Sequence, residues 1–410
     1  MEVTLFIVLA WLMLVFAMLF RHAPTLAALW REPALARPVL IVESDDWGPG
    51  PESDARMLQR IAALLAGIRD ADAHPVVMTL GVVLGVPDGP AILAEGCRHY
   101  HRSTLDEARH ALIVQAMKQG CAAGVFALQR HGLEHCWPGA LLERAREEVG
   151  LRTWLADPAA RSETLPAALQ SRWVDAAVLP SRALPEDEIG AAVAQEGVLF
   201  RLVFGAAPAV AVPNTFVWSD AVERAWAADG VRCVVTCGCQ FPGRAADGGL
   251  MPPARTLRNG DHGVGGVRYV VRDAYFEPCR GHRAEHVWQA VAQRTALGRP
   301  TLLETHRLSF IDPATGESAL AELVRALRGV LERHPGVCFI STEQLAAAFD
   351  DPQHALRLHG FAARSALFLR RMRVEAALSR PLKLCGLYLL LPLAARLAVT
   401  LSAAGGRRGC

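Results

Sequence analysis

The chain has 410 residues, of which 52% are hydrophobic and 20% are charged, and its net charge at pH 7 is +2. This composition excludes a disordered or low-complexity protein, and the length allows one large domain with extensions, or two domains. The charge is uneven, because residues 351–410 carry ten Lys and Arg against two acids, which makes this segment +8 and the remainder −6. An acidic body with a basic, apolar tail favours a membrane surface as partner and no nucleic acid. The tail also lacks the spaced aromatic residues of a surface that binds single strands.

The first predicted element is a transmembrane anchor within residues 1–22. Val3–Phe20 contains 18 residues without a charge, and as a helix it would span about 27 Å, enough to cross a bilayer core. No basic segment precedes it and no small-residue cleavage site follows it directly, which favours an uncleaved anchor. Arg21, Arg31 and Arg37 follow the helix, so the positive-inside rule predicts a single-pass protein of a bacterial-type inner membrane with its body in the cytoplasm. The alternative is that the long body is translocated regardless of these charges, to the periplasm.

Residues 36–350 are predicted to form one α/β domain. Short apolar runs that are rich in β-branched residues and bounded by Gly, Pro or Asp indicate buried strands. These runs are 39–42, 76–83, 125–128, 231–235, 267–271, 301–303 and 337–340. Helical patterns such as Glu317–Arg333 lie between them. This alternation predicts a mostly parallel sheet, and if the sheet closes, functional residues should lie at the carboxyl ends of its strands.

Four residues in this domain have the pattern of a catalytic metal site. The first predicted strand is followed by Asp45 and Asp46, two adjacent carboxylates that point in different directions. His131 and His135 are four residues apart, which in a helical turn would put both on one side. One carboxylate and two imidazoles leave a position open for water, as in catalytic rather than structural metal sites. The second carboxylate is then free to act as a base on that water.

Three motifs in this order resemble those of the polysaccharide deacetylases, metal-dependent carbohydrate esterases with the NodB-type fold. Ser44–Gly48 (SDDWG) resembles the first motif and Gln129–His135 (QRHGLEH) resembles the second. Leu302–Arg307 (LLETHR) resembles the late strand that ends in a histidine acid. The resemblance implies a distorted (β/α)7 barrel. It also implies the roles of the site residues. Asp45 would be the general base and His306 the general acid, and Asp46, His131 and His135 would be the three metal ligands.

The chain departs from the family pattern between the second and the last motif. The family has an Arg-Pro motif there, whose Arg supports the base, whereas the nearest candidate, Val212–Trp218, contains no Arg. Arg272 is the candidate replacement. Trp47 and Glu277 are further candidates for contacts with the substrate or with the primary site residues. These departures indicate a divergent, membrane-anchored member.

Residues 351–410 are predicted to be a basic amphipathic tail that contacts membrane lipid. Phe361–Ser379 alternates arginines with apolar residues, as in a helix that lies on a lipid surface. Leu384–Ala395 is uncharged, but it has only 12 residues and contains Pro392, which predicts interfacial or re-entrant placement rather than a span. The alternative is that both segments are helices that pack on the barrel.

The resemblance implies a hydrolase that removes an N-acyl group, such as acetyl, from a sugar of a polysaccharide or a lipid-linked glycan. A divalent ion, with Zn2+ as the expected one, would hold the nucleophilic water; Asp45 would deprotonate that water, and His306 would protonate the leaving amine. The anchor and the basic tail favour a lipid-linked substrate. Two alternatives stay open: an O-acetyl esterase on the same scaffold, and a non-catalytic, membrane-tethered protein for glycan binding or assembly. The sequence sets neither the sugar nor the oligomeric state.

Overall fold

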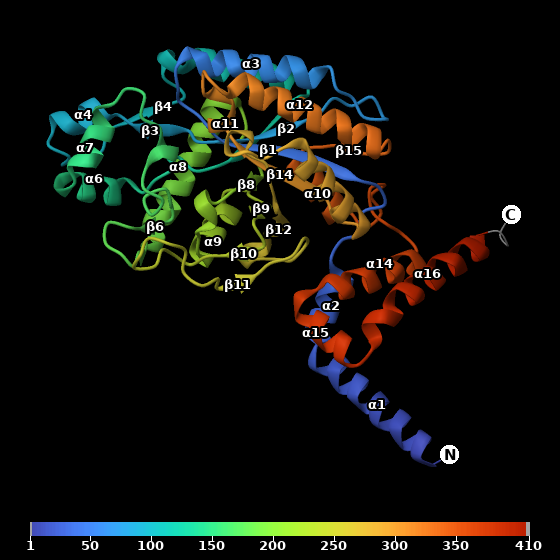
Figure 1. Ribbon diagram of the computed structural model, residues 1–410. Coiled ribbons are helices and arrows are strands. Elements are labelled where there is room, and N and C mark those ends of the chain that lie inside the picture. Colours follow the sequence, from blue (N-terminus) through green and yellow to red (C-terminus); the bar gives the residue numbers. More distant parts are fainter. Residues whose placement is uncertain (1, 407–410) are drawn as a thin grey trace. The chain divides into compact units, whose positions relative to one another are not determined.

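The computed structural model describes residues 2–406, and side chains as far as residue 398. The chain divides into two compact units. The barrel unit comprises residues 40–290 and 301–347, and the terminal unit comprises residues 1–39, 291–300 and 348–410. Figure 1 shows the elements of both units. Two basic residues of the predicted tail, Arg407 and Arg408, lie outside the described residues.

A parallel sheet forms the centre of the barrel unit. Its strand order is β12-β9-β8-β5-β2-β1-β14-β13, and β15 also pairs with β1. The bounds are β1 Val39–Trp47, β2 Met78–Val82, β5 Phe126–Arg130, β8 Val210–Ala211, β9 Cys233–Thr236, β12 Arg268–Val271, β13 Ala274–Tyr275, β14 Thr301–His306 and β15 Cys338–Phe339. Every residue of β1 and β2 is buried, as expected of parallel strands covered on both faces.

One short segment closes this sheet into a barrel. β12 pairs with β9 at one end of the strand order, and β13 pairs with β14 at the other end. Only Arg272 and Asp273 separate β12 from β13. The segment 268–275 therefore connects both edges and acts as one of seven strand positions. The predicted distorted (β/α)7 barrel is confirmed, and Arg272 lies at its joint.

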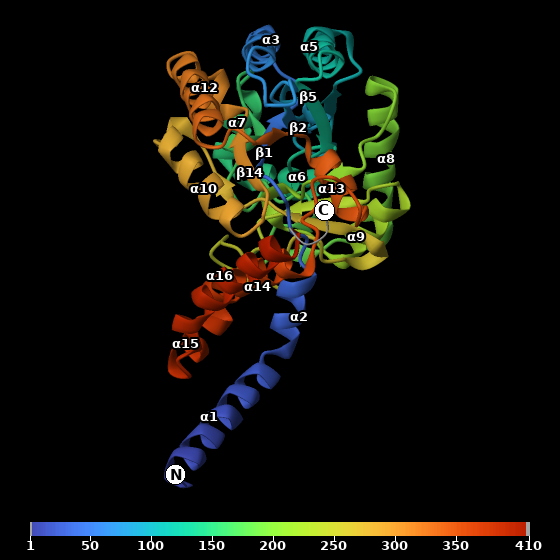
Figure 2. The same cartoon turned by 90° about the vertical axis from the view of Figure 1, so that its right-hand side faces the viewer.

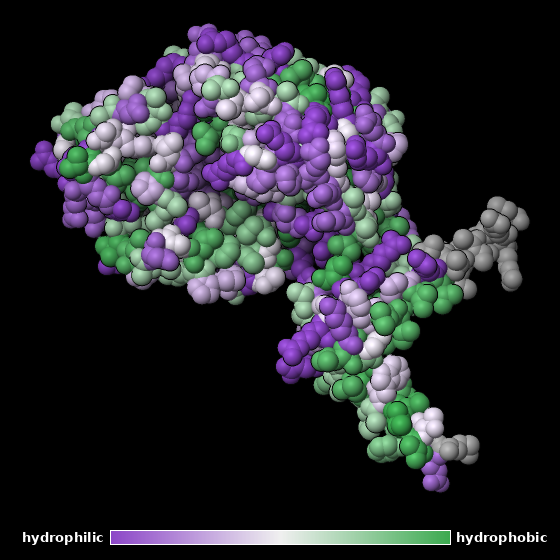
Figure 3. Space-filling view, viewed as in Figure 1, coloured by the Kyte–Doolittle hydropathy of each residue, from purple (hydrophilic) through white to green (hydrophobic). Residues whose placement is uncertain are grey.

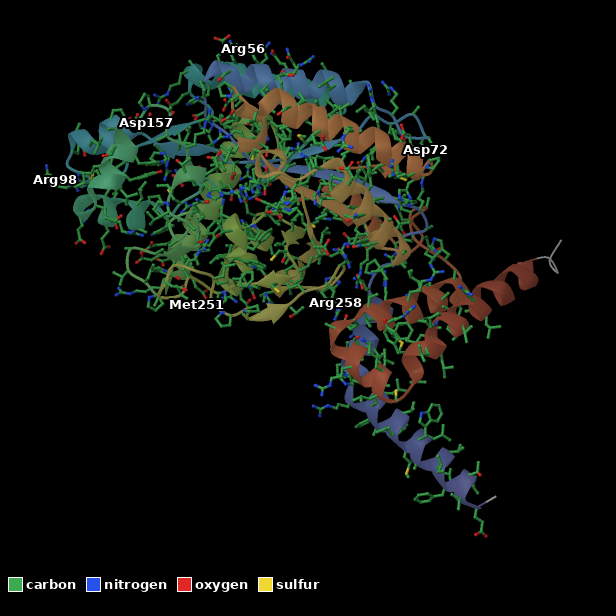
Figure 4. The ribbon with its side chains drawn as sticks, viewed as in Figure 1. Arg56, Asp72, Arg98, Asp157, Met251 and Arg258 are labelled. Atoms are coloured by element: carbon green, nitrogen blue, oxygen red, sulfur yellow. The ribbon has the colours of Figure 1, made fainter. Side chains whose placement is uncertain are left out.

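Helices surround the sheet (Figure 2). Their bounds are α3 Glu52–Ala66, α4 Gly89–Ala94, α5 Ala111–Ala122, α6 Pro138–Glu147, α7 Val149–Ala156, α8 Glu186–Phe204, α9 Asp220–Ala228, α10 Ala284–Ala296, α11 Leu308–Ile311, α12 Gly316–Arg333 and α13 Thr342–Asp350. Three antiparallel pairs lie in the connections: β3 Gly85–Pro87 with β4 Arg102–Thr104, β6 Val174–Asp175 with β7 Arg182–Ala183, and β10 Cys239–Gln240 with β11 Arg255–Thr256. Short 3-10 turns cover Ala108–His110, Ser162–Thr164, Asn214–Phe216, Val264–Gly266 and Pro278–Arg280. Charged side chains such as Arg56, Asp72 and Arg98 lie on the outside of this unit (Figure 4).

The terminal unit consists of helices from both ends of the chain. They are α1 Glu2–Arg21, α2 Ala23–Arg31, α14 Phe361–Val374, α15 Ala376–Leu384 and α16 Leu387–Gly406. α1 is long and apolar enough to cross a membrane, and most of its residues are exposed. Its length and composition fit a membrane anchor or a signal sequence.

The predicted basic helix at Phe361–Ser379 differs from the observed structure in two respects. It is interrupted at Glu375, between α14 and α15. Arg371, which the pattern placed on the basic face, is only 2% exposed and donates hydrogen bonds to backbone carbonyls of this unit. This arginine is therefore part of the packing of the terminal unit.

Candidate active site

The two carboxylates lie at the carboxyl end of β1, where the strand is irregular. The register between β1 and β2 shifts between Ser44 and Trp47, and Asp46 has a positive φ of 70°. Non-glycine residues seldom adopt this left-handed conformation, which is concentrated at functional sites. The two side chains have different partners, because Asp46 contacts two histidines whereas Asp45 contacts an arginine.

Asp46, His131 and His135 form a buried cluster with the spacing of metal ligands. The Oδ1 atom of Asp46 lies 3.3 Å from Nε2 of His131 and 3.2 Å from Nε2 of His135, and the three ligand atoms lie within 4.8 Å of one another. In a tetrahedral site with bonds of about 2.0–2.1 Å, neighbouring ligand atoms are about 3.4 Å apart. This donor set therefore fits a divalent ion such as Zn2+ and leaves a coordination position for water.

The two histidines lie in a loop after β5, so the expected helical turn is wrong. Gly132 has a φ of 93°, which lets the chain reverse between His131 and His135. Nδ1 of His131 lies 3.0 Å from the carbonyl oxygen of Val212. Because a carbonyl only accepts, this nitrogen carries the proton and leaves Nε2 free as a ligand. The side chain of Asn214 donates to the carbonyl oxygen of His131 at 2.8 Å and holds the loop in place.

Arg272 supports Asp45 from the joint of the barrel. Its Nη2 atom lies 2.7 Å from Oδ2 of Asp45, and its guanidinium lies 5.3 Å from the centre of the Phe216 ring. Burial alone would raise the pKa of Asp45, but Arg272, followed by His131, holds that pKa below its ordinary value. The carboxylate is thus ionised at neutral pH, as a general base must be. Arg272 therefore occupies the supporting position for which the sequence offered it as a candidate.

Glu43 is a third carboxylate in this network, and sequence reasoning missed it. It accepts hydrogen bonds from Thr342 and, at 3.1 Å, from Nη1 of Arg272. Burial, together with the nearby charge of Asp45, raises the pKa of Glu43 to about 7, although Arg272 opposes this. The available signal was an acid directly after an apolar run that forms a central strand, where a carboxylate needs a buried partner.

His306 lies next to Asp45 on the neighbouring strand β14, and its ring contacts the carboxylate of Glu277. The two residues are paired in the register of β1 and β14. Nδ1 of His306 lies 2.5 Å from Oε1 of Glu277, and Ser309 donates to the other carboxylate oxygen. Burial lowers the pKa of His306, but the hydrogen bond to Glu277 and the charges of nearby carboxylates outweigh it and raise the pKa to about 10. His306 is therefore protonated at neutral pH, which suits a proton donor.

A cavity of about 250 Å³ joins these groups. The residues from the three motifs that line it are Asp45, Asp46, His131, His135, Glu304 and His306, and Arg272 and Glu277 line it as well. Thr215 and Phe216 also line it, with unusual positive φ angles of 54° and 57°, and sequence reasoning missed both. Trp47 is fully buried, donates to the Ser44 hydroxyl and does not line the cavity, so a direct contact between Trp47 and a substrate held there is excluded.

Known proteins offer a limited comparison. No family model and no curated protein matches the chain. Similar solved structures include the chitin deacetylase from the fungal pathogen Colletotrichum lindemuthianum, with 11% identity over 80% of this chain and 96% of that chain and a TM-score of 0.38. They also include a family 4 carbohydrate esterase from Streptomyces lividans, with 12% identity, coverage of 80% and 99%, and a TM-score of 0.34.

A third similar structure has another activity. It is the 4-alpha-glucanotransferase from Thermococcus litoralis, with 8% identity over 77% of this chain and 40% of that chain and a TM-score of 0.40. The first two structures bear the names of the family that the three motifs resemble. Similarities of this size do not distinguish one activity from another, so function must be argued from the residues of the site.

Proposed function

We propose that the protein is a metal-dependent hydrolase that removes an N-acyl group, such as acetyl, from a sugar of a glycan. One observation carries this proposal: a three-ligand cluster, an ionised carboxylate and a protonated histidine line the same cavity. A purely structural metal site needs neither a base nor an acid beside it. A glycan-binding site needs none of the three.

Asp46, His131 and His135 would hold the divalent ion, which supplies Lewis acidity toward the acyl carbonyl and toward water. Asp45 accepts the proton of the attacking water, and Arg272 keeps that carboxylate ionised and oriented. His306 donates its proton to the sugar nitrogen as the C–N bond breaks, which releases the amine and the free acid. Glu277 holds the ring of His306 and favours its protonated form.

The proposed substrate is a lipid-linked glycan at the cytoplasmic leaflet. α1 would hold the protein at the membrane as an uncleaved anchor, and Arg21, Arg31 and Arg37 after it favour a cytoplasmic body. A tethered enzyme meets a membrane-bound substrate at high local concentration. Equal activity on soluble and lipid-linked acylated sugars would contradict this part of the proposal.

The test measures metal content and acyl release of the detergent-purified protein. We expect about one equivalent of divalent ion per chain, lost in Asp46→Ala and His131→Ala. His74→Ala is the matched control, because His74 belongs to a separate group of two acids and a histidine, of which Asp72 and His74 are exposed. Asp45→Asn should keep the ion and lose activity by about 10²–10⁴-fold.

Two results would reassign the function. Release of acyl groups from esters but not from amides would make the protein an O-acetyl esterase. Absence of bound metal in the wild type after reconstitution, with Asp45→Asn unaffected in cells, would leave the tethered binding protein.

A further inference from the structure

The C-terminal helices contain a sharp apolar elbow. α15 and α16 meet at Cys385 and Gly386 and are bent by 106° relative to each other. Gly386 has a φ of 76°, which a residue without a side chain adopts readily. The two helices together are apolar enough to pass as a broken membrane span. Several of their leucines are strongly exposed: Leu384 at 77%, Leu389 at 76%, Leu393 at 57% and Leu397 at 63%.

The elbow is attached to the middle of α1. The indole Nε1 of Trp11 donates a hydrogen bond of 2.9 Å to the backbone oxygen of Cys385. Between this contact and the C-terminal end of α1, apolar side chains of α1 and of the two C-terminal helices form one cluster. Its buried members include Met18, Leu378, Leu382 and Leu391. A break in a helix leaves carbonyl groups without an intrahelical donor. In lipid no water can replace that donor, so such a carbonyl needs a partner within the protein, and Trp11 is one for Cys385.

The position of Trp11 along α1 gives the depth of the elbow. Trp11 precedes Arg21, the charged end of α1, by ten residues, which is about 15 Å along a helix. This is half of a hydrocarbon core of about 30 Å. α15 has nine residues and reaches about 13 Å, so it extends from the interface to within about 2 Å of that depth.

Two cations lie over one aromatic ring beside the elbow. Lys383 lies over the ring of Tyr388, with its Nζ 5.3 Å from the ring centre, and the guanidinium of Arg373 lies over the same ring at 4.7 Å. Long cationic side chains of this kind reach back to the headgroups while their stems stay in lipid. A cation–π contact partly replaces the water lost on the way.

We infer that α15 and α16 form a re-entrant hairpin, which enters the bilayer beside α1 from the side of Arg21 and returns to the same side. The occupant of its exposed leucine face is lipid. Residues 361–398 carry seven Lys and Arg against one acid, so two copies of this surface would repel each other, whereas anionic headgroups would attract both. The apolar surface of these helices is continuous with that of α1 within the terminal unit (Figure 3). This inference does not depend on the proposed enzymatic function.

Photolabelling of the full-length protein tests the depth of the hairpin. The protein is reconstituted in vesicles of phosphatidylcholine and phosphatidylglycerol that contain a lipid with a diazirine at the end of its acyl chain, or a lipid with the diazirine in its headgroup. Labelled residues are then identified by mass spectrometry. We expect the deep probe to label Leu389 and Leu393 as it labels the middle of α1 around Trp11. Labelling of these leucines by the headgroup probe alone would overturn the hairpin and leave a surface helix.

Two controls separate the hairpin from other placements. Val198 and Leu202 on α8 are 60% and 68% exposed but belong to the barrel unit, so neither probe should label them efficiently. Trp11→Phe keeps an apolar ring and loses the hydrogen bond, and should lower deep labelling of Leu389 roughly threefold. In sealed vesicles, a C-terminal epitope should be digested from the same side as the barrel. Digestion from the opposite side would show a full span and would also overturn the inference.

Discussion

At the scale of single residues, different surroundings give two carboxylic acids and a histidine of the site different shifts in pKa. Asp45 is ionised because Arg272 contacts it, whereas Glu43, on the other side of the same guanidinium, has a pKa near neutrality. His306 has a raised pKa because Glu277 accepts its ring proton. Base and acid are thereby in opposite protonation states at the same pH.

Glu277→Gln should move the alkaline limb of the activity profile. The pKa of His306 is raised to about 10, so the proton donor stays charged through neutral pH and is lost only in alkali. Glutamine retains an oxygen for the ring N–H but carries no charge, so we expect the limb to fall by at least about one pH unit. Profiles of kcat against pH for both forms, with metal content checked, measure this. An unmoved limb would show that Glu277 only orients the ring.

Glu43→Gln should remove a pH dependence of stability. The folded state raises the pKa of Glu43 from 4.5 to about 7, so between these values it binds more protons than the unfolded chain. The free energy of unfolding is therefore expected to fall as pH rises from 4.5 to 7, by up to about 3 kcal/mol. Glutamine stays neutral and should flatten this slope. Urea unfolding at pH 5 and pH 7.5 checks the difference, with the exposed Glu52→Gln as control.

At the scale of elements, the sequence predicted every strand of the main sheet except β8 and β13. All seven apolar runs overlap observed strands, six of them strands of four or more residues and the seventh the two-residue β15, because a continuous β-branched run is a local signal. β8 and β13 have two residues each, and only their neighbours make them strands. The joint at Arg272 was likewise invisible, because it depends on which strands flank it in space.

In the site, too, the sequence predicted residues that lie in short motifs and missed residues whose partners are distant in the sequence. The ligands, the base and the acid could be named because each lies in a short motif. The loop that carries His131 and His135 was misjudged as helical, since spacing alone does not reveal the positive φ of Gly132. Glu43, Thr215 and Phe216 could not be assigned roles, because their partners are far away in the sequence.

Arg371 supplies hydrogen bonds to carbonyl groups at the ends of two helices. Its guanidinium donates to the carbonyl oxygens of Leu29 in the last turn of α2, of Glu32 and Pro33 just after it, and of Leu297 and Gly298 after α10. It thus binds carbonyls at the ends of two helices, where a positive charge is also favoured by the helix dipole.

Arg371→Met should loosen both helix ends. We expect a loss of about 2–4 kcal/mol of local stability, because several buried carbonyls would lose a charged donor. Hydrogen exchange of the amides in residues 29–34 and 296–299 measures it. Arg370→Met is the matched control, because Arg370 is the adjacent residue on α14 and is exposed. Equal exchange in the two variants would mean that Arg371 has no such role.

At the scale of the whole molecule, a bound ion should stabilise the barrel unit. The ligands come from the end of β1 and from the loop after β5, so an ion would connect segments that are about 85 residues apart and would bind only the folded state. At a free concentration 100 times Kd, the gain is about 2.7 kcal/mol, which for a unit of this size is a Tm increase of roughly 5–10 °C.

Thermal unfolding with and without chelator measures this shift. The wild type should lose the increase on chelation, and His131→Ala should show none at any ion concentration. An increase in His131→Ala equal to that of the wild type would place the ion elsewhere, for example at Asp70, Asp72 and His74.

The contact between Trp11 and Cys385 also constrains the order of biosynthesis. α1 leaves the ribosome first, yet its partners α15 and α16 are made last. At about 5–20 residues per second, roughly 15–60 s of translation separate the two ends of the terminal unit. During that interval the indole of Trp11 has no partner within the chain, and the barrel unit is synthesised completely. A chain that stops before residue 376 would therefore hold a finished barrel unit and an α1 that still lacks its partner helices, so we expect such truncations to be recognised by cellular quality control.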